Sequence, residues 1–307
     1  MTKLSISRKI TINKPASDVY NVLSDFHQWK TWSPWLIQEP ETEISVSDDG
    51  KFYSWNGNLT GVGNMLIVDQ KQDAYLHHDL TFIKPWKSTA KVKFDLEAVG
   101  EGTVVTWSMN SSLPFFLFWM KGMMEALVGM DYERGLAMLK DYVEDGEVHS
   151  KLDFQDTSDL NGFKYVGIRT ETTRKQIGQS MKADFERLAA FCNDNQDKIA
   201  GEPFSIYHKW DMIKGDVIYT SGFPVKTIPE GLADGFVTGE LPSTKVYSIK
   251  HTGPYEHLGN AWSTLFNMKQ NKFFRTNKKI DPFEIYKNDP AKVDPNQLET
   301  VVSFAVK

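Results

Sequence analysis

Two stretches of the chain decide its fold: HTGPY at residues 251–255 and PFEIYKNDP at residues 282–290. The second stretch is typical of a short strand and sets Glu284 between Phe283 and Ile285. A carboxylate with apolar neighbours either faces water or needs a partner, because burying an unpaired charge is costly. The position of Glu284 therefore decides how the function is interpreted.

Around these stretches the same order of elements is expected twice, as strand, helix, strand and strand. The first set covers residues 163–171, 174–193, 203–209 and 216–223, and the second covers residues 244–251, 254–269, 282–287 and 300–306. The match between the sets lies in the order of elements more than in the residues. A pseudo-symmetric pair of β-α-β-β repeats of this kind predicts a groove between them.

Aromatic residues accompany Glu284 in the expected strands and helices. A buried carboxylate among aromatic rings would select organic cations, since each well-placed ring contributes roughly 0.5–2 kcal/mol besides the charge pairing. The candidate ligand-binding residues are Glu284, Tyr255, Trp262, Tyr286, Trp210 and Tyr247.

Other interpretations of these residues remain open from the pattern. Glu284 could be a surface carboxylate on an edge strand, or could pair with Lys250 or Lys287. Tyr255 and Trp262 also fit the core side of a helix. His251 fits a strand histidine with a local hydrogen bond better than a catalytic base.

The first half of the chain predicts a different α+β domain. An alternating strand at residues 4–12 precedes a helix from Lys14 to about Asp25, and six strand-like runs separated by turn residues follow between residues 41 and 109. Apolar residues then recur at helical spacing over residues 115–144, which predicts one or two amphipathic helices. We expect an antiparallel meander that grips the last helix and encloses a tunnel.

The composition limits the class of protein. The length of 307 residues suits two domains, and the polar stretch at residues 149–160 is expected to link a domain at residues 1–148 to one at residues 161–307. Of the net charge of −5, the first 150 residues carry −6, from 14 Lys+Arg and 20 Asp+Glu. Neither half has the excess of cations that phosphate binding requires, so nucleic acid is not an expected partner.

Cysteine content and the apolar runs narrow the class further. Cys192 is the single cysteine, so no intramolecular disulfide is possible, and no zinc-ligand spacing occurs. We expect Cys192 to pack as a small apolar residue. The longest apolar run has eight residues, Leu113 to Met120, against about 20 for a membrane span. The start of the chain shows no export signal, which points to the cytoplasm.

The second half resembles the GyrI-like small-molecule-binding family, which is also the effector-binding domain of multidrug-responsive bacterial transcription activators. The resemblance rests on HTGPY at residues 251–255, the helix that contains Trp262, and EIYKNDP at residues 284–290. It implies two β-α-β-β repeats around a ligand groove, with Glu284 as the counter-ion for cationic aromatic ligands. Some members of the family are thought to hydrolyse electrophilic compounds, which would make Glu284 the general base and Tyr255 a hydrogen-bond donor.

The first half is similar to the SRPBCC superfamily, also called START-like or polyketide cyclase/dehydrase and lipid-transport domains. The segments ITINKPASDVY at residues 10–20, WKTWSPW at residues 29–35 and GVG at residues 61–63 carry this resemblance. It implies a helix-grip fold with a deep apolar cavity. The candidate lining residues of that cavity are Trp32, Trp35, Trp55, Trp107, Met120 and Met124.

Three functions follow as hypotheses. The first is a protein that binds or sequesters small hydrophobic or cationic molecules without a metal or organic cofactor. The second is a hydrolase that acts on an electrophilic xenobiotic at Glu284. The third is an accessory regulator that senses a ligand and signals to a partner protein, since a START-like domain occupies the place where transcription activators of the GyrI-like family carry a helix-turn-helix.

Overall fold

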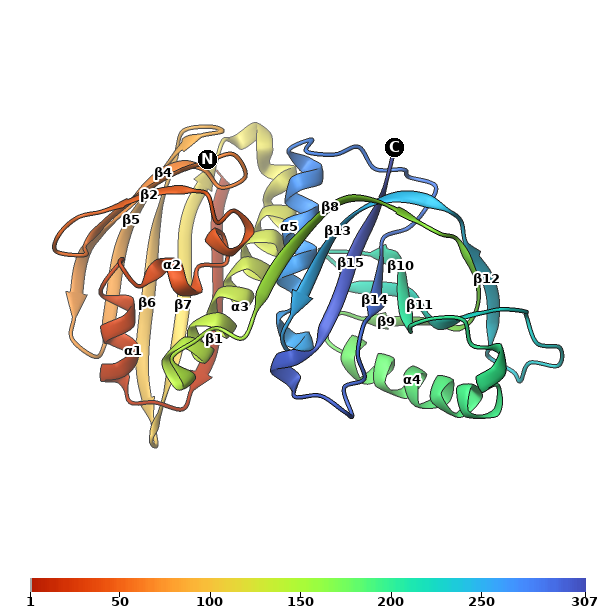
Figure 1. The fold of residues 1–307 in the computed structure, drawn as a ribbon. Coiled ribbons are helices and arrows are strands. Elements are labelled where there is room, and N and C mark those ends of the chain that lie inside the picture. The colour runs from red at the N-terminus through yellow and green to blue at the C-terminus, as the bar shows by residue number, and fades with distance from the viewer. Residues whose placement is uncertain (1) are drawn as a thin grey trace. The chain divides into compact units, whose positions relative to one another are not determined.

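The computed structural model describes residues 2–307, which form two compact units that meet between Ser150 and Lys151 (Figure 1). Each unit has its own antiparallel sheet. No helix in the described residues is both long enough and apolar enough to cross a bilayer.

The sheet of the first unit has seven strands in the order β1-β7-β6-β5-β4-β3-β2. After β1 the strands follow one another along the chain as a meander, and β1 pairs with β7 from Thr2 opposite Leu113 to Ile12 opposite Thr103. The predicted strand, helix and six-strand order is confirmed. The strands are β1 (Thr2–Ile12), β2 (Glu43–Val46), β3 (Phe52–Gly57), β4 (Gly61–Lys71), β5 (Tyr75–Lys84), β6 (Ser88–Val99) and β7 (Gly102–Leu113).

Helices cover one side of this sheet. The longest, α3, begins after a 3-10 segment and ends at Asp145. The next residue, Gly146, has a φ of 81°, which is the left-handed conformation that glycine adopts at helix ends. Its buried residues, including Tyr132, Leu136 and Leu139, complete the core. The helical elements are α1 (Ala16–Leu23), α2 (Trp29–Trp32), η1 (Leu36–Gln38), η2 (Phe115–Met120) and α3 (Lys121–Asp145).

The second unit has an eight-stranded sheet in the order β12-β9-β11-β10-β14-β15-β13-β8. The two predicted repeats appear as β9-α4-β10-β11 and β13-α5-β14-β15, so the α+β fold of the prediction is confirmed. The strands are β8 (Lys151–Leu160), β9 (Phe163–Thr173), β10 (Phe204–Trp210), β11 (Asp216–Val225), β12 (Val237–Leu241), β13 (Thr244–Thr252), β14 (Phe283–Tyr286) and β15 (Glu299–Val306). The helical elements are α4 (Ile177–Asp194), η3 (Gln196–Lys198), η4 (Tyr255–His257), α5 (Gly259–Gln270) and η5 (Pro295–Gln297).

The stretch expected as a linker is mostly strand, which corrects the prediction for residues 149–160. Residues 151–160 form β8, which pairs along β13 from Thr244 opposite Leu160 to Thr252 opposite Lys151. β8 lies at the edge of the sheet, and only Leu152, Phe154 and Leu160 are half-buried. An edge strand keeps polar side chains on its outer face, so its composition is that of a linker. The other edge strand, β12, was not expected either.

Candidate functional site

Glu284 lies in an inner strand of the second unit. β14 runs between β10 and β15, with Glu284 opposite Ser205 on one side and Val302 on the other. The side chain is only 2 % exposed. The alternative of a surface carboxylate on an edge strand is therefore wrong.

Three neutral donors hold the carboxylate. The hydroxyl of Tyr207 donates to Oε2 at 3.0 Å, and the hydroxyl of Tyr286 donates to the same oxygen at 2.7 Å. The indole Nε1 of Trp262 donates to Oε1. Glu284 and Tyr286 are two residues apart in one strand, so their side chains share a face of the sheet. The donors thus come from β10, β14 and α5.

No cation pairs with Glu284 among residues 2–307. The two lysines considered from the sequence bond elsewhere, Lys250 to Glu299 at 3.1 Å and Lys287 to Glu202 at 2.6 Å. Burial raises the pKa of Glu284 above its usual 4.5, while the hydrogen bonds from Tyr286, Trp262 and Tyr207 oppose the rise. The ionised carboxylate is therefore stabilised only by hydrogen bonds from neutral side chains, and no positive charge balances it.

Aromatic rings cover the carboxylate. The Tyr286 ring meets Tyr255 edge-on at 5.8 Å and Phe185 at 5.4 Å. The Trp262 ring lies 4.9 Å from that of Tyr207. Tyr255, 41 % exposed, brings this set to the surface, and burial beside Glu284 raises the pKa of its hydroxyl to about 12. A ligand that reaches Glu284 must displace part of this cover.

Four of the six ligand-binding candidates therefore lie together, and two lie further out. Trp210 touches the set through Tyr207, with the two ring centres 6.0 Å apart. Tyr247 stacks on Phe274 at 4.8 Å, and its hydroxyl faces Asp156 at 3.4 Å. Tyr247 belongs to a neighbouring aromatic group.

The pairing of Tyr207 with Glu284 did not follow from the sequence. Tyr207 stands out in sequence only as one of several aromatic residues, and the two residues are 77 positions apart. A second buried carboxylate, Asp184, was also missed; it accepts hydrogen bonds from Tyr219 at 2.6 Å and Thr170 at 2.7 Å. The spacing of Asp184 from Leu188, the other buried residue of α4, was the only feature of the sequence that could have indicated its burial.

The raised pKa of Glu284 predicts a pH effect on stability. The folded chain keeps this proton at pH values where the unfolded chain has lost it, so the contribution of Glu284 to folding declines as pH rises from 4.5 through the raised value. Glu284→Gln removes this titration. We expect the free energy of unfolding of Glu284→Gln, relative to the parent, to increase from about pH 4 to about pH 8 in urea titrations. A difference that is constant or decreases over this range contradicts the raised pKa.

The histidine considered from the sequence, His251, lies inside the second unit. His251 is buried on β13, and burial together with the nearby His257 lowers its pKa to about 4. No cluster of three or more His, Cys, Asp or Glu side chains able to hold a metal occurs within residues 2–307. Cys192 is half-buried, and burial raises the pKa of its thiol to about 11.

The cavity candidates of the first unit are buried tryptophans in its core and half-buried residues next to it. The Trp107 ring contacts both Trp32 and Trp35, at 5.9 and 5.8 Å. Trp55 stacks on Tyr53 at 5.4 Å. Met124 packs half-buried against this core, and Met120 lies in η2.

Three buried ring nitrogens in that core have no hydrogen-bond partner among the described residues. They are Nε1 of Trp32, Nε1 of Trp107 and Nδ1 of His78. All three rings contact Phe94, at 6.3, 4.8 and 5.7 Å. Buried polar atoms are normally satisfied, so these nitrogens would gain hydrogen bonds from a water or from a polar group placed beside them.

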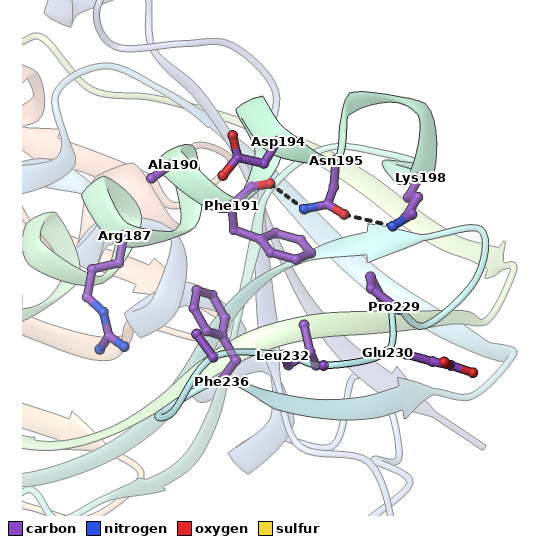
Figure 2. A pocket seen from close by; sticks show the side chains of 12 residues that line it. Arg187, Ala190, Phe191, Asp194, Asn195, Lys198, Pro229, Glu230, Leu232 and Phe236 are labelled. Atoms are coloured by element: carbon purple, nitrogen blue, oxygen red, sulfur yellow. Dashed lines mark hydrogen bonds between the residues drawn. The ribbon is translucent and has the colours of Figure 1, made fainter.

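A separate hollow of about 450 Å³ lies beside the end of α4 (Figure 2). Phe191 and Phe236 contact each other in its lining with ring centres 5.4 Å apart, and the guanidinium of Arg187 lies 5.6 Å from the Phe236 ring. Charged side chains of both signs line its rim, including Asp194, Lys198 and Glu230. None of the predicted site residues borders it.

The two units match families of ligand-binding domains. Residues 3–144 match the family described as polyketide cyclase/dehydrase and lipid transport, and residues 157–307 match the GyrI-like small molecule binding domain. The chain carries a domain of each of these two families, in that order. Both resemblances inferred from the sequence are confirmed.

Solved structures with similar parts are distant in sequence. The C-terminal domain of EcmrR is 15 % identical, with 52 % of this chain and 98 % of that chain covered and a TM-score of 0.38. SAV2435 bound to tetraphenylphosphonium is 16 % identical, with 50 % and 94 % covered and a TM-score of 0.39. The Aha1 dimer from Colwellia psychrerythraea is 20 % identical, with 47 % and 98 % covered and a TM-score of 0.35. No curated protein matches the sequence.

Proposed function

We propose that the second unit binds small hydrophobic cations, with Glu284 as the counter-ion and Tyr286, Trp262 and Tyr255 as the aromatic wall. The observation that carries this proposal is a carboxylate 2 % exposed that has neutral donors and no cationic partner within residues 2–307. A ligand cation would supply the missing charge in a low-dielectric setting, where the interaction is stronger than in water. The rings would add cation–π attraction.

The same geometry favours a counter-ion over a general base. A carboxylate offers about four lone-pair positions, and Tyr207, Tyr286 and Trp262 already use three of them. A base needs a free position aimed at a water or a substrate proton, and the remaining position belongs to a side chain that is only 2 % exposed. Hydrolysis at Glu284 is therefore the second candidate, and sensing with a partner protein is the third.

The first unit supplies a second place for an apolar ligand within the same proposal. Its aromatic core includes Trp32, Trp35, Trp55 and Trp107, and the unpartnered nitrogens of Trp32 and His78 offer polar contacts. A guest there would be mostly apolar with one or two hydrogen-bonding groups. Such a ligand differs in charge from the one proposed for the second unit.

Two ions of the same shape and opposite charge test the proposal. We expect tetraphenylphosphonium to bind the full chain at least about tenfold more tightly than tetraphenylborate, because only the cation pairs with Glu284. Isothermal titration measures both affinities. Equal affinities, or tighter binding of the borate, would contradict a counter-ion at Glu284.

Turnover separates the first two candidates. Mass spectrometry of the recovered ligand should show it unchanged after long incubation if the chain only binds. Release of a hydrolysed product from an ester or epoxide, lost in Glu284→Gln, would instead identify a hydrolase. Ligand-dependent capture of a protein partner would support sensing.

A further inference from the structure

The first unit carries a group of exposed aromatic side chains at one end of its sheet. Phe115, Phe116, Phe118 and Trp119 of η2 are 61–76 % exposed, and Trp86 in the turn between β5 and β6 is 58 % exposed. We call these five residues the aromatic tip. Exposed apolar groups of this size mark interaction sites, because isolated monomers rarely present several large rings together.

The strand register brings the two parts of the tip to the same end of the sheet. β5 and β6 meet at Phe82 opposite Ser88, and β6 pairs with β7 through Ala90 opposite Ser111. The turn at residues 85–87 and the segment that begins at Pro114 therefore leave neighbouring strands in the same direction (Figure 1). Adjacent strands are about 4.8 Å apart, so the two protrusions lie close together.

The tip is shaped to leave its rings outside the core. In η2, Leu117 packs against the core of the unit, whereas the four aromatic residues on either side of it point outward. The rings of Phe115 and Phe116 contact each other at 5.8 Å. The folded unit therefore leaves these rings in contact with water. Their transfer into an apolar environment outside the protein would be favourable.

Lysines are the charged residues within the two segments that carry the tip. Residues 83–91 and 113–124 contain no Asp or Glu, and they include Lys84, Lys87 and Lys121. Lys84 and Lys87 are exposed without an ion pair among residues 2–307, and Lys121 has a loose contact of 3.7 Å to Glu125. The first 150 residues carry a net charge of −6, so the net charge of the two tip segments is opposite in sign to that of the unit as a whole.

We propose that the aromatic tip docks on the surface of an anionic lipid bilayer. Trp and Phe favour the interface between headgroups and acyl chains, and nearby lysines gain from anionic lipid. Protein interfaces are depleted in Lys and need about 800 Å² of matched surface on each partner, which two short protrusions flanked by lysines do not resemble. The chain would bind at the membrane surface with its sheet outside the bilayer.

Vesicle co-sedimentation of the full chain tests this proposal. We expect the parent to bind vesicles that contain phosphatidylglycerol and to bind pure phosphatidylcholine vesicles much less. The double variant Phe115→Ser/Phe118→Ser should lose roughly tenfold or more in apparent affinity for the vesicles, because it removes two rings that the bilayer would otherwise bury. Lys84→Gln/Lys87→Gln should lose about fivefold per lysine and should flatten the salt dependence.

A matched substitution controls for general hydrophobicity. Phe273→Ser removes a ring that is 52 % exposed in the second unit, and it should leave vesicle binding unchanged. Absence of vesicle binding by the parent overturns the proposal, and so does equal binding by all variants. A dimer that dissociates in the double variant, without vesicle binding, would assign the tip to a second copy of the chain.

Discussion

Glu284→Gln is expected to weaken tetraphenylphosphonium binding about 100-fold or more. A unit charge about 4 Å from a cation contributes about 4 kcal/mol at the effective dielectric of a partly buried site, and the amide keeps the shape while it removes the charge. Titration calorimetry on the parent and the variant measures the change. Unchanged binding would mean that the cation lies elsewhere.

The second buried carboxylate provides the control for this variant. Asp184 accepts hydrogen bonds from Tyr219 and Thr170, and it too lacks an ion pair among the described residues. Asp184→Asn should leave binding within about tenfold of the parent, because the Coulomb term falls with distance. If both variants lose affinity equally, the negative field of the whole unit, and not Glu284, would explain the effect.

Trp107→Ala is expected to destabilise the first unit by about 3–5 kcal/mol. Trp107 is 1 % exposed, and its ring stacks on Tyr132 at 3.9 Å and on Phe94 at 4.8 Å. The change removes these contacts and leaves a void that close-packed neighbours fill only partly. Urea unfolding followed by circular dichroism measures the loss.

The exposed Trp86 is the matched control for Trp107. Trp86→Ala removes the same side chain from a turn where it is 58 % exposed, and we expect a change below about 0.5 kcal/mol. A cost of less than about 1 kcal/mol for Trp107→Ala would show that the ring borders an open tunnel and does not pack in a filled core.

The fold could be predicted because its signals are local. Alternation over residues 4–12, turn residues between the strands and helical spacing over residues 115–144 fix the first sheet and its closing helix. The repeated order of elements in residues 163–306 fixes the second sheet. The edge strands β8 and β12 were not predicted from the sequence. Half of an edge strand faces water, so its composition resembles that of a loop.

The site could be predicted only in part. Glu284, Tyr286 and Tyr255 follow from two motifs and Trp262 from the helix between them, and the structure brings all four together. Tyr207 lies in the neighbouring strand β10 and donates a hydrogen bond to Glu284. The two residues are far apart in the sequence, so nothing in the sequence indicated that they would meet. Tyr247 is aromatic and in a strand like the others, but its ring stacks in a separate group with Phe274. Side-chain direction within a sheet depends on register, which the sequence alone leaves open.

Locating a heavy-atom cation in a crystal of the full chain tests the central claim most directly. Tetraphenylarsonium has the shape and charge of the phosphonium probe, and its arsenic gives an anomalous signal. We predict a peak beside the carboxylate of Glu284, among the rings of Tyr286, Trp262 and Tyr255. A peak at the hollow lined by Phe191 and Phe236, or within the first unit, would contradict Glu284 as the counter-ion.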